Sequence, residues 1–166
     1  MINGNELSKI EETYLYIIKS SQSNVNFGHT LFNKILYFSD FDFYERNERS
    51  ITGDNYIHSD HGPTAKRFSE IIKELKGKKL INEVRVERSK DHVQKRYILS
   101  EDFEPTKLTK DEILELDRNI SRLGGMTASQ VSAYSHQDMP YKASSKNQII
   151  NYELVFYRDP VFSATL

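Results

Sequence analysis

Residues 31–44 read LFNKILYFSDFDFY, and this stretch decides the fold. Apolar and aromatic side chains fill so many of its positions that, wound as a helix, they cover more than one face. A helix that is apolar nearly all round is either buried at the centre of a fold or covered by a partner. We predict a helix over residues 30–46, with burial at the centre of the fold as the first interpretation and cover by a partner as the second.

Further helices are predicted on both sides of this stretch. In residues 6–20 apolar side chains recur at helical spacing; they are Leu7, Ile10, Tyr14, Ile17 and Ile18. In residues 63–76 a one-sided apolar stripe consists of Phe68, Ile71, Ile72 and Leu75. Pro63 suits the first turn of that helix, because its missing N–H has no helical partner there.

Two capping boxes mark helix starts in the C-terminal half. Thr109 is followed three residues later by Glu112, and Thr127 by Gln130. This pattern lets the hydroxyl and the longer side chain satisfy two free backbone N–H groups at a helix start. We predict a helix from residue 109 to the glycines at 124–125, and a short one from 127 to about 136.

Residues 80–100 change to a period of two. Val84 and Val86 alternate with Arg85 and Glu87, a similar run covers 94–99, and polar residues 89–92 lie between them. This pattern predicts a β-hairpin. Residues 50–63 are predicted to be irregular, with a turn at 52–54. The apolar tail at 149–157 is expected to pack back onto the domain.

Together these elements predict an α+β fold that is mainly α, with one β-hairpin in a winged-helix-like arrangement. The 166 residues contain no repeat and no Pro/Gly/Ser-rich linker, so we expect a single domain over 1–166 with its core at about 7–157. The chain contains 37% hydrophobic and 28% charged residues, which is ordinary for a globular domain.

The cysteine count and the first residues restrict the setting. With no cysteine there is no disulfide, thiol nucleophile or cysteine-bound zinc, which fits a reducing cytosol. The first six residues, MINGNE, do not resemble a signal peptide, and no apolar run reaches the length of a membrane span. We therefore expect a cytoplasmic protein with no membrane partner.

Charge is distributed unevenly along the chain. Residues 61–100 carry eleven Lys and Arg against five Asp and Glu, whereas residues 101–117 carry seven acids against two lysines. The two segments either steer a charged partner or face each other within the fold. The net charge of −1 argues against a protein that coats nucleic acid over its whole surface.

Catalytic and metal-binding patterns are weak in this sequence. His58, Asp60 and His61 are possible zinc ligands, but they lie in an irregular loop with no helical register to bring them together. Ser135 and His136 precede an acid at 138, without the Gly-x-Ser-x-Gly turn that exposes a nucleophilic serine. Phosphate-binding glycine motifs do not occur. We expect no enzyme activity, no metal and no cofactor.

DNA binding is the alternative function. A basic hairpin behind a helix is typical of a winged helix, in which the wing touches phosphates and the helix enters the major groove. The basic residues concerned are Arg85, Arg88, Lys90, Lys95 and Arg96 on the hairpin, and Lys66, Arg67, Lys73 and Lys76 on the helix. Glu70 and Glu74 share that helix, and we do not expect nucleic acid to be the main partner.

Several short motifs, taken in order, resemble the SocA-like Panacea-domain antitoxins. The segment NKILYFSD at residues 33–40, with Lys34, is similar to the signature that opens this domain. The remaining motif positions are Thr52, Gly53, Tyr56, His61, Gly62, Pro63, Ser135, His136, Pro140, Tyr141 and Tyr152. His61 stands where the family usually has an aromatic residue, and Tyr141 where it has Trp.

The resemblance implies a non-catalytic antitoxin that neutralises a cognate toxin by direct contact. The toxin is expected to be encoded by the adjacent gene, and a role as adaptor to a protease is also known in the family. We predict that the toxin contacts a preformed surface anchored by a few side chains. The candidate contact residues are Tyr37, Asp40, Tyr44, Tyr56, His61, Arg67, His136 and Tyr141.

Overall fold

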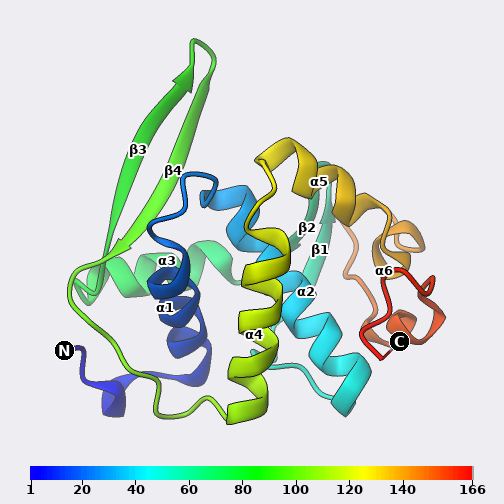
Figure 1. Ribbon diagram of the computed structural model, residues 1–166, viewed down its shortest axis with the longest axis horizontal. Coiled ribbons are helices and arrows are strands. Elements are labelled where there is room, and N and C mark those ends of the chain that lie inside the picture. The colour runs from blue at the N-terminus through cyan, green and yellow to red at the C-terminus, as the bar shows by residue number, and fades with distance from the viewer. Residues whose placement is uncertain (166) are drawn as a thin grey trace.

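A computed structural model describes residues 1–165 of the chain (Figure 1). The α-helices are α1 (Lys9–Ser21), α2 (His29–Asn47), α3 (Phe68–Gly77), α4 (Lys110–Leu123), α5 (Ala128–His136) and α6 (Met139–Lys142). The strands are β1 (Tyr56–Ser59), β2 (Gly62–Ala65), β3 (Ile81–Ser89) and β4 (His92–Leu99). Short 3-10 turns cover η1 (Gly4–Glu6) and η2 (Tyr152–Tyr157). Among the residues described, no helix is both long and apolar enough to cross a membrane.

Helix α2 lies at the centre of the molecule, as the sequence predicts (Figure 1). Every residue from 31 to 43 is buried, and the neighbours that cover the helix include α4, α5, β2 and η2. The fold is thus mainly helical with a small β component, and α2 is the element on which the others pack.

Four polar side chains on this buried helix are each matched by a group from another part of the chain. The Asn33 side-chain carbonyl accepts from the Ala65 N–H, and the Lys34 amine donates to the Pro63 carbonyl. Further along, Asp40 and Asp42 accept from the loop after α2 and from Arg158, respectively. Because a buried polar group is costly unless it is paired, these bonds fix which segment packs where.

The two small sheets are separate antiparallel pairs, β1 with β2 and β3 with β4. The β3–β4 hairpin covers the predicted region and stands out from the helical body (Figure 1). Its base is tied to the core, because Ile81 and Tyr97 are buried. The capping boxes at Thr109 and Thr127 also form as predicted, at the starts of α4 and α5.

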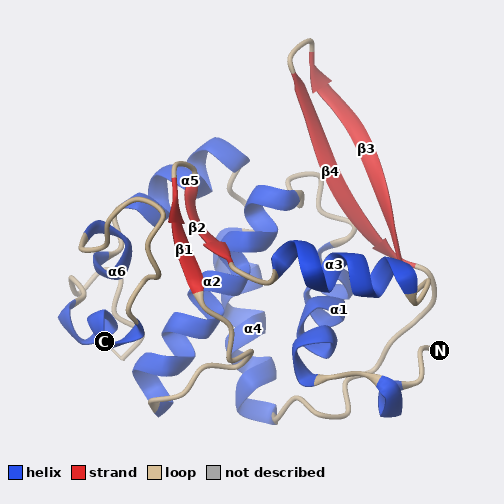
Figure 2. Ribbon diagram, turned by 180° about the vertical axis from the view of Figure 1, so that it is seen from behind, coloured by secondary structure: helices blue, strands red, loops and turns tan. Residues whose placement is uncertain are grey.

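The region from 50 to 67 differs from the prediction. Residues 56–59 and 62–65 form the β1–β2 pair beside α5 (Figure 2), and the following helix begins at Phe68 rather than at Pro63. Pro63 lies in β2, which is an edge strand and therefore tolerates a residue without an N–H. The α2 side chains of Asn33 and Lys34 hold this segment extended by bonding to its backbone.

The C-terminal tail packs back onto the body, as expected. The Arg158 guanidinium is fully buried and donates to Asp138 at 2.8 Å, to Asp42 at 2.7 Å and to Glu45 at 3.0 Å. Nearby carboxylates raise the pKa of Arg158, although burial alone would lower it. This network joins the tail to α2 and to the residue that precedes α6.

Candidate functional site

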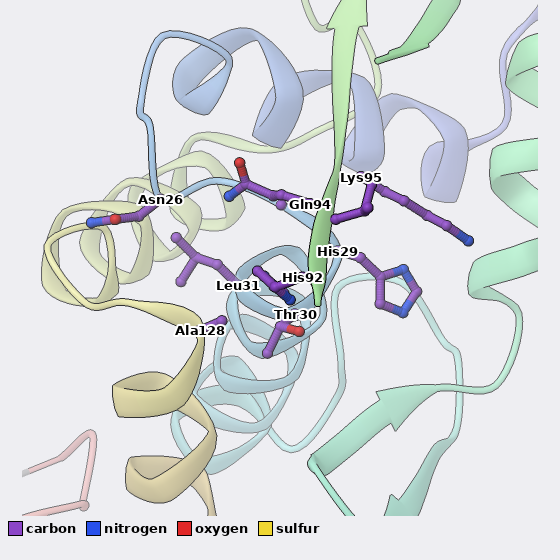
Figure 3. A pocket seen from close by; sticks show the side chains of 10 residues that line it. Asn26, His29, Thr30, Leu31, His92, Gln94, Lys95 and Ala128 are labelled. Carbon is purple, nitrogen blue, oxygen red and sulfur yellow. The ribbon is translucent and has the colours of Figure 1, made fainter. Parts of the chain in front are cut away.

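A groove runs between the β3–β4 hairpin and α5, above the first turn of α2. It consists of two adjoining pockets of about 240 Å³ and about 760 Å³, which share Thr30, His92 and Ala128. We call it the hairpin–α5 groove. Figure 3 shows its smaller pocket, with β4 passing over the start of α2.

Each wall of the groove comes from a different part of the chain. Strand β4 supplies His92, Val93, Gln94 and Lys95, and the segment that opens α2 supplies Asn26, Gly28, His29, Thr30 and Leu31. The opposite wall consists of Asp60, His61, Ala128, Ser129, Ser132, Ala133, His136 and Gln137. Segments distant in sequence therefore meet at one concave face.

A set of hydrogen bonds fixes the wall formed by α5 and the β1–β2 turn. Three successive carbonyl oxygens of that turn accept bonds from the region of α5 and α6. The Tyr141 hydroxyl donates to the Ser59 carbonyl at 2.5 Å, His136 Nε2 lies 2.9 Å from the Asp60 carbonyl, and the Ser132 hydroxyl donates to the His61 carbonyl at 2.6 Å. Since three neighbouring carbonyls are held, the turn has a defined position in the groove wall.

Behind this wall, motif residues from three elements meet at Gly62. Its φ of +108° lies in the region that favours glycine. A Cβ at this position would stand 2.4 Å from Ser135 Oγ and 2.7 Å from Lys34 Cε. The contact therefore requires glycine, and it places Lys34 and Ser135 directly behind the residues His61 and His136 that line the groove.

Lys34 is a buried amine with few polar neighbours. Its Nζ donates to the Pro63 carbonyl at 3.1 Å, and the residue is 2% exposed. Burial lowers the pKa of Lys34 to about 7, because the charged amine loses its hydration. This amine supports β2 from inside the fold.

The lining of the groove carries little negative charge. Among its described lining residues Asp60 is the single carboxylate, and it already pairs with Lys146 at 3.1 Å. Lys95 supplies a positive charge, and four histidines supply ring nitrogens that can form hydrogen bonds. The His136 ring lies between the Ser132 and Asp60 carbonyls.

Two of the eight predicted contact residues, His61 and His136, line the groove. Tyr44 and Arg67 are at the surface elsewhere; the Tyr44 hydroxyl donates to Glu153, and Arg67 pairs with Glu70 at 2.7 Å. The geometry thus brings together the two histidines and not the other predicted contacts.

The remaining four predicted contact residues are buried in this structure and do not lie on the groove surface. Tyr37 and Tyr56 are fully buried, Asp40 is 1% exposed and Tyr141 is 5% exposed. Tyr37 donates to Asp138, while Tyr141 holds the β1–β2 turn. These side chains stabilise the fold, because a partner at the surface does not reach them.

Asp40 organises the loop after α2. Its carboxylate accepts from the Ile51 and Thr52 N–H groups, from the Thr52 hydroxyl and from the Tyr56 hydroxyl. Burial raises the pKa of Asp40 to about 6, and these four donors act in the opposite direction. The neighbouring Gly53 has a φ of +74°, which completes the turn predicted at 52–54.

Two other motif residues are structural as well. Pro140 lies in the first turn of α6, where a missing N–H costs nothing. Tyr152 stacks on Phe41 with ring centroids 4.1 Å apart, and its hydroxyl donates to the Asp54 carbonyl at 2.7 Å. Pro140 thus supports the start of α6, and Tyr152 covers α2 at Phe41.

The residues considered for zinc take separate partners. His58 stacks on Tyr141 and lies 2.8 Å from the Ser144 hydroxyl, whereas Asp60 pairs with Lys146. Within residues 1–165 no group of three His, Cys, Asp or Glu side chains is arranged to hold a metal.

The serine considered as a nucleophile is also engaged. Ser135 is fully buried and donates to the Ser132 carbonyl at 2.7 Å. Asp138 accepts from Tyr37 and Arg158 and does not touch the His136 ring, whose nitrogens face backbone carbonyls. These three residues do not form a catalytic triad.

The winged-helix-like element is not confirmed. Helix α3 buries its apolar stripe, and its exposed side mixes acids with bases. On or beside that side Glu70 pairs with Arg67, and Lys76 pairs with Glu83 of β3 at 2.8 Å. A helix whose basic groups are paired in this way does not present a continuous surface for the phosphate backbone.

Sequence reasoning missed most of the groove. Thr30, Ser129, Ser132 and Ala133 carry no pattern that distinguishes them from ordinary surface residues, and they come together only in the fold. The basic hairpin was the one available signal, because it indicated a charged projecting strand.

The comparisons with known proteins agree with the motif residues. The family description that matches is "Antitoxin SocA-like, Panacea domain", over residues 32–142. This match covers more than half of the 166 residues, and the chain belongs to the SocA-like Panacea-domain antitoxin family. No curated protein and no solved structure matches the chain.

Proposed function

We propose that this protein is a non-catalytic antitoxin that neutralises a protein toxin by direct contact at the hairpin–α5 groove. One observation carries the proposal: residues within the family match build this groove. Lys34, Gly62 and Ser135 touch one another behind it, and His61 and His136 beside them line it. The contact of Gly62 with Lys34 and Ser135 fixes the backbone behind the groove. A binding site that exists before the partner arrives needs a wall held in this way.

The proposed partner is the product of the adjacent gene, in the cytoplasm of the cell that makes both. Binding at the groove occludes the part of the toxin that acts on its target. Specific interfaces of this kind bury about 1,600 Å² in total, so the toxin extends beyond the groove onto α5 and the hairpin.

The test is co-expression with the adjacent gene's product, followed by growth measurement and co-purification. Wild-type protein is expected to restore growth and to form a complex. In the Ala133→Arg variant, a bulky cation enters the groove from an exposed position on α5. We expect binding to weaken about tenfold or more, since such a side chain blocks close approach.

Leu114→Arg is the matched control, because Leu114 is 48% exposed on α4 and does not line the groove. Equal neutralisation by both variants would place the toxin elsewhere on the surface. A harmless neighbour that forms no complex would refute the antitoxin function. Faster loss of the toxin in the presence of this protein would identify delivery to a protease instead of occlusion.

A further inference from the structure

Strand β4 has a free edge that faces the hairpin–α5 groove. In an antiparallel pair, residues alternate between those that bond to the partner strand and those that direct their backbone N–H and C=O outward. The Ser100 N–H donates to the Leu80 carbonyl at 2.9 Å, which extends the register Ile81↔Leu99 by one pair. Even-numbered β4 residues therefore bond to β3, and odd-numbered residues face outward.

The lower end of this edge is closed and the upper end is open. The outward Leu99 N–H donates to the Gln22 side chain at 3.0 Å, which agrees with the alternation. By the same alternation the N–H groups of Val93 and Lys95 face outward, and in the part of the chain that the structure describes neither donates to a group outside the β3–β4 pair. Both residues line the smaller pocket, so their free backbone groups border it.

The space beside the edge fits one further strand. Neighbouring strands lie about 4.8 Å apart, so a chain added to β4 would occupy the pocket above Thr30 and Leu31. The opposite side of that pocket is Ala128, a small residue at the start of α5. The small Ala128 side chain leaves room on that side for an extended backbone.

Unpaired cations flank the open edge. Arg88 and Arg96, from the two strands, both donate to the Val25 carbonyl, and the Arg88 charge lowers the pKa of Arg96 together with burial. Among the described residues neither arginine has a carboxylate partner, and the same is true of Lys95. In Figure 3, Gln94 and Lys95 project from opposite sides of β4, so cations lie on both sides of an added strand.

We propose that an extended, acidic segment of a protein partner binds as an additional strand along the β4 edge at Val93 and Lys95. The inference deepens the proposed function, because it names the chemistry of the toxin segment recognised. Backbone hydrogen bonds supply affinity in this mode, and the flanking charges select an acidic sequence. Nucleic acid shares the negative charge but has no peptide groups to pair with the open edge.

The first test needs no toxin. The probe is a fluorescent eight-residue peptide in which glutamate alternates with valine, and its binding is followed by anisotropy. Lys95→Pro removes one outward N–H and leaves the bonds between β3 and β4 in place. The matched control is Arg85→Pro, because Arg85 lies directly opposite Lys95 and faces the other edge of the hairpin.

We expect Lys95→Pro to weaken peptide binding about tenfold or more, and Arg85→Pro to leave it within about twofold. Both variants remove one positive charge. A difference between their peptide affinities therefore shows the effect of losing a backbone N–H on the β4 edge. A second probe, the same peptide N-methylated at alternate amides, cannot pair as a strand and is expected not to bind. The methylated peptide is tested on the wild-type protein, so this experiment remains informative even where a proline variant fails to fold.

Equal binding by the two proline variants would overturn the proposal, and so would equal binding of the methylated peptide. A short DNA duplex that binds as tightly as the peptide would also overturn it, in favour of a charge-only site. The same variants are then tested for growth rescue with the adjacent gene. If the wild type rescues growth and Lys95→Pro and Arg85→Pro rescue it equally well, the antitoxin function is retained. Binding of the toxin along the β4 edge is then rejected.

Discussion

Helix α2 and the β3–β4 hairpin differ in whether their polar groups have partners within the chain. Asn33, Lys34, Asp40 and Asp42 on α2 are buried, and each has a specific partner from another segment. The hairpin instead turns backbone groups of β4 outward, and in the described chain Arg88, Lys95 and Arg96 have no carboxylate partner. The polar groups of α2 therefore determine how the chain packs. Those of the hairpin remain accessible, and the proposed partner segment would bind them.

The strongest challenge to this view of α2 is the loss of Arg158. Arg158→Met would leave Asp42 and Asp138 buried without their shared cation. We expect the free energy of unfolding to fall by about 3–5 kcal/mol, measured by urea denaturation. Arg118→Met is the control, since Arg118 is 47% exposed and 3.9 Å from Glu115, and it should cost less than about 0.5 kcal/mol. Similar losses in both variants would contradict a special role for the buried network.

Gly62 tests the connection between α2 and the groove. Gly62→Ala places a Cβ against Ser135 and Lys34 and requires a φ that disfavours alanine. We expect a loss of about 2–4 kcal/mol in thermal or urea unfolding, together with weaker toxin binding. Gly77→Ala, near the end of α3 with open space around it, should instead gain up to about 1 kcal/mol. A neutral Gly62→Ala would show that the groove wall adapts.

Lys34 makes the stability of the core depend on pH. Its pKa is lowered to about 7 in the fold, whereas a lysine in the unfolded chain titrates near about 10.4. Between these values the unfolded chain binds a proton that the native state lacks, so the free energy of unfolding rises with pH. From pH 7.5 to 9 the wild type should gain about 2 kcal/mol relative to Lys34→Met. Parallel pH profiles for the two proteins would show that the buried amine is charged.

The smallest predicted effect compares the loss of methyl groups from α2 and from the hairpin. Ile35→Val removes one methyl from a fully buried position on α2 and should cost about 1 kcal/mol. Val93→Ala removes two methyls from a hairpin residue that is 55% exposed and should cost less than about 0.5 kcal/mol. The free energies of unfolding of both variants would be measured by urea denaturation. A larger loss for Val93→Ala would mean that the hairpin carries core stability.

The fold could be predicted where a local pattern decides it. The apolar density of residues 31–44, the capping boxes at Thr109 and Thr127 and the period of two in the hairpin are all local features. The β1–β2 pair could not be predicted, because side chains of α2 hold it extended.

The candidate site was predicted less well for the same reason. Buried tyrosines such as Tyr37 and Tyr56 look like surface anchors in a sequence, since burial depends on contacts with distant segments. His61 and His136 were predicted to contact the partner, and they line the groove because Ser132 and His136 hold the β1–β2 turn. The open edge of β4 depends on strand register, which residue types alone do not fix.

The position of Arg158 bears on when the protein matures during synthesis. Asp42 leaves the ribosome 116 residues ahead of Arg158, whose guanidinium neutralises it. A nascent chain can form the contacts of α2 with α4 and α5 while Asp42 and Asp138 still need water around them. The native packing is therefore complete only after residue 158 has left the ribosome, and nascent chains that stop before it offer proteases a looser substrate.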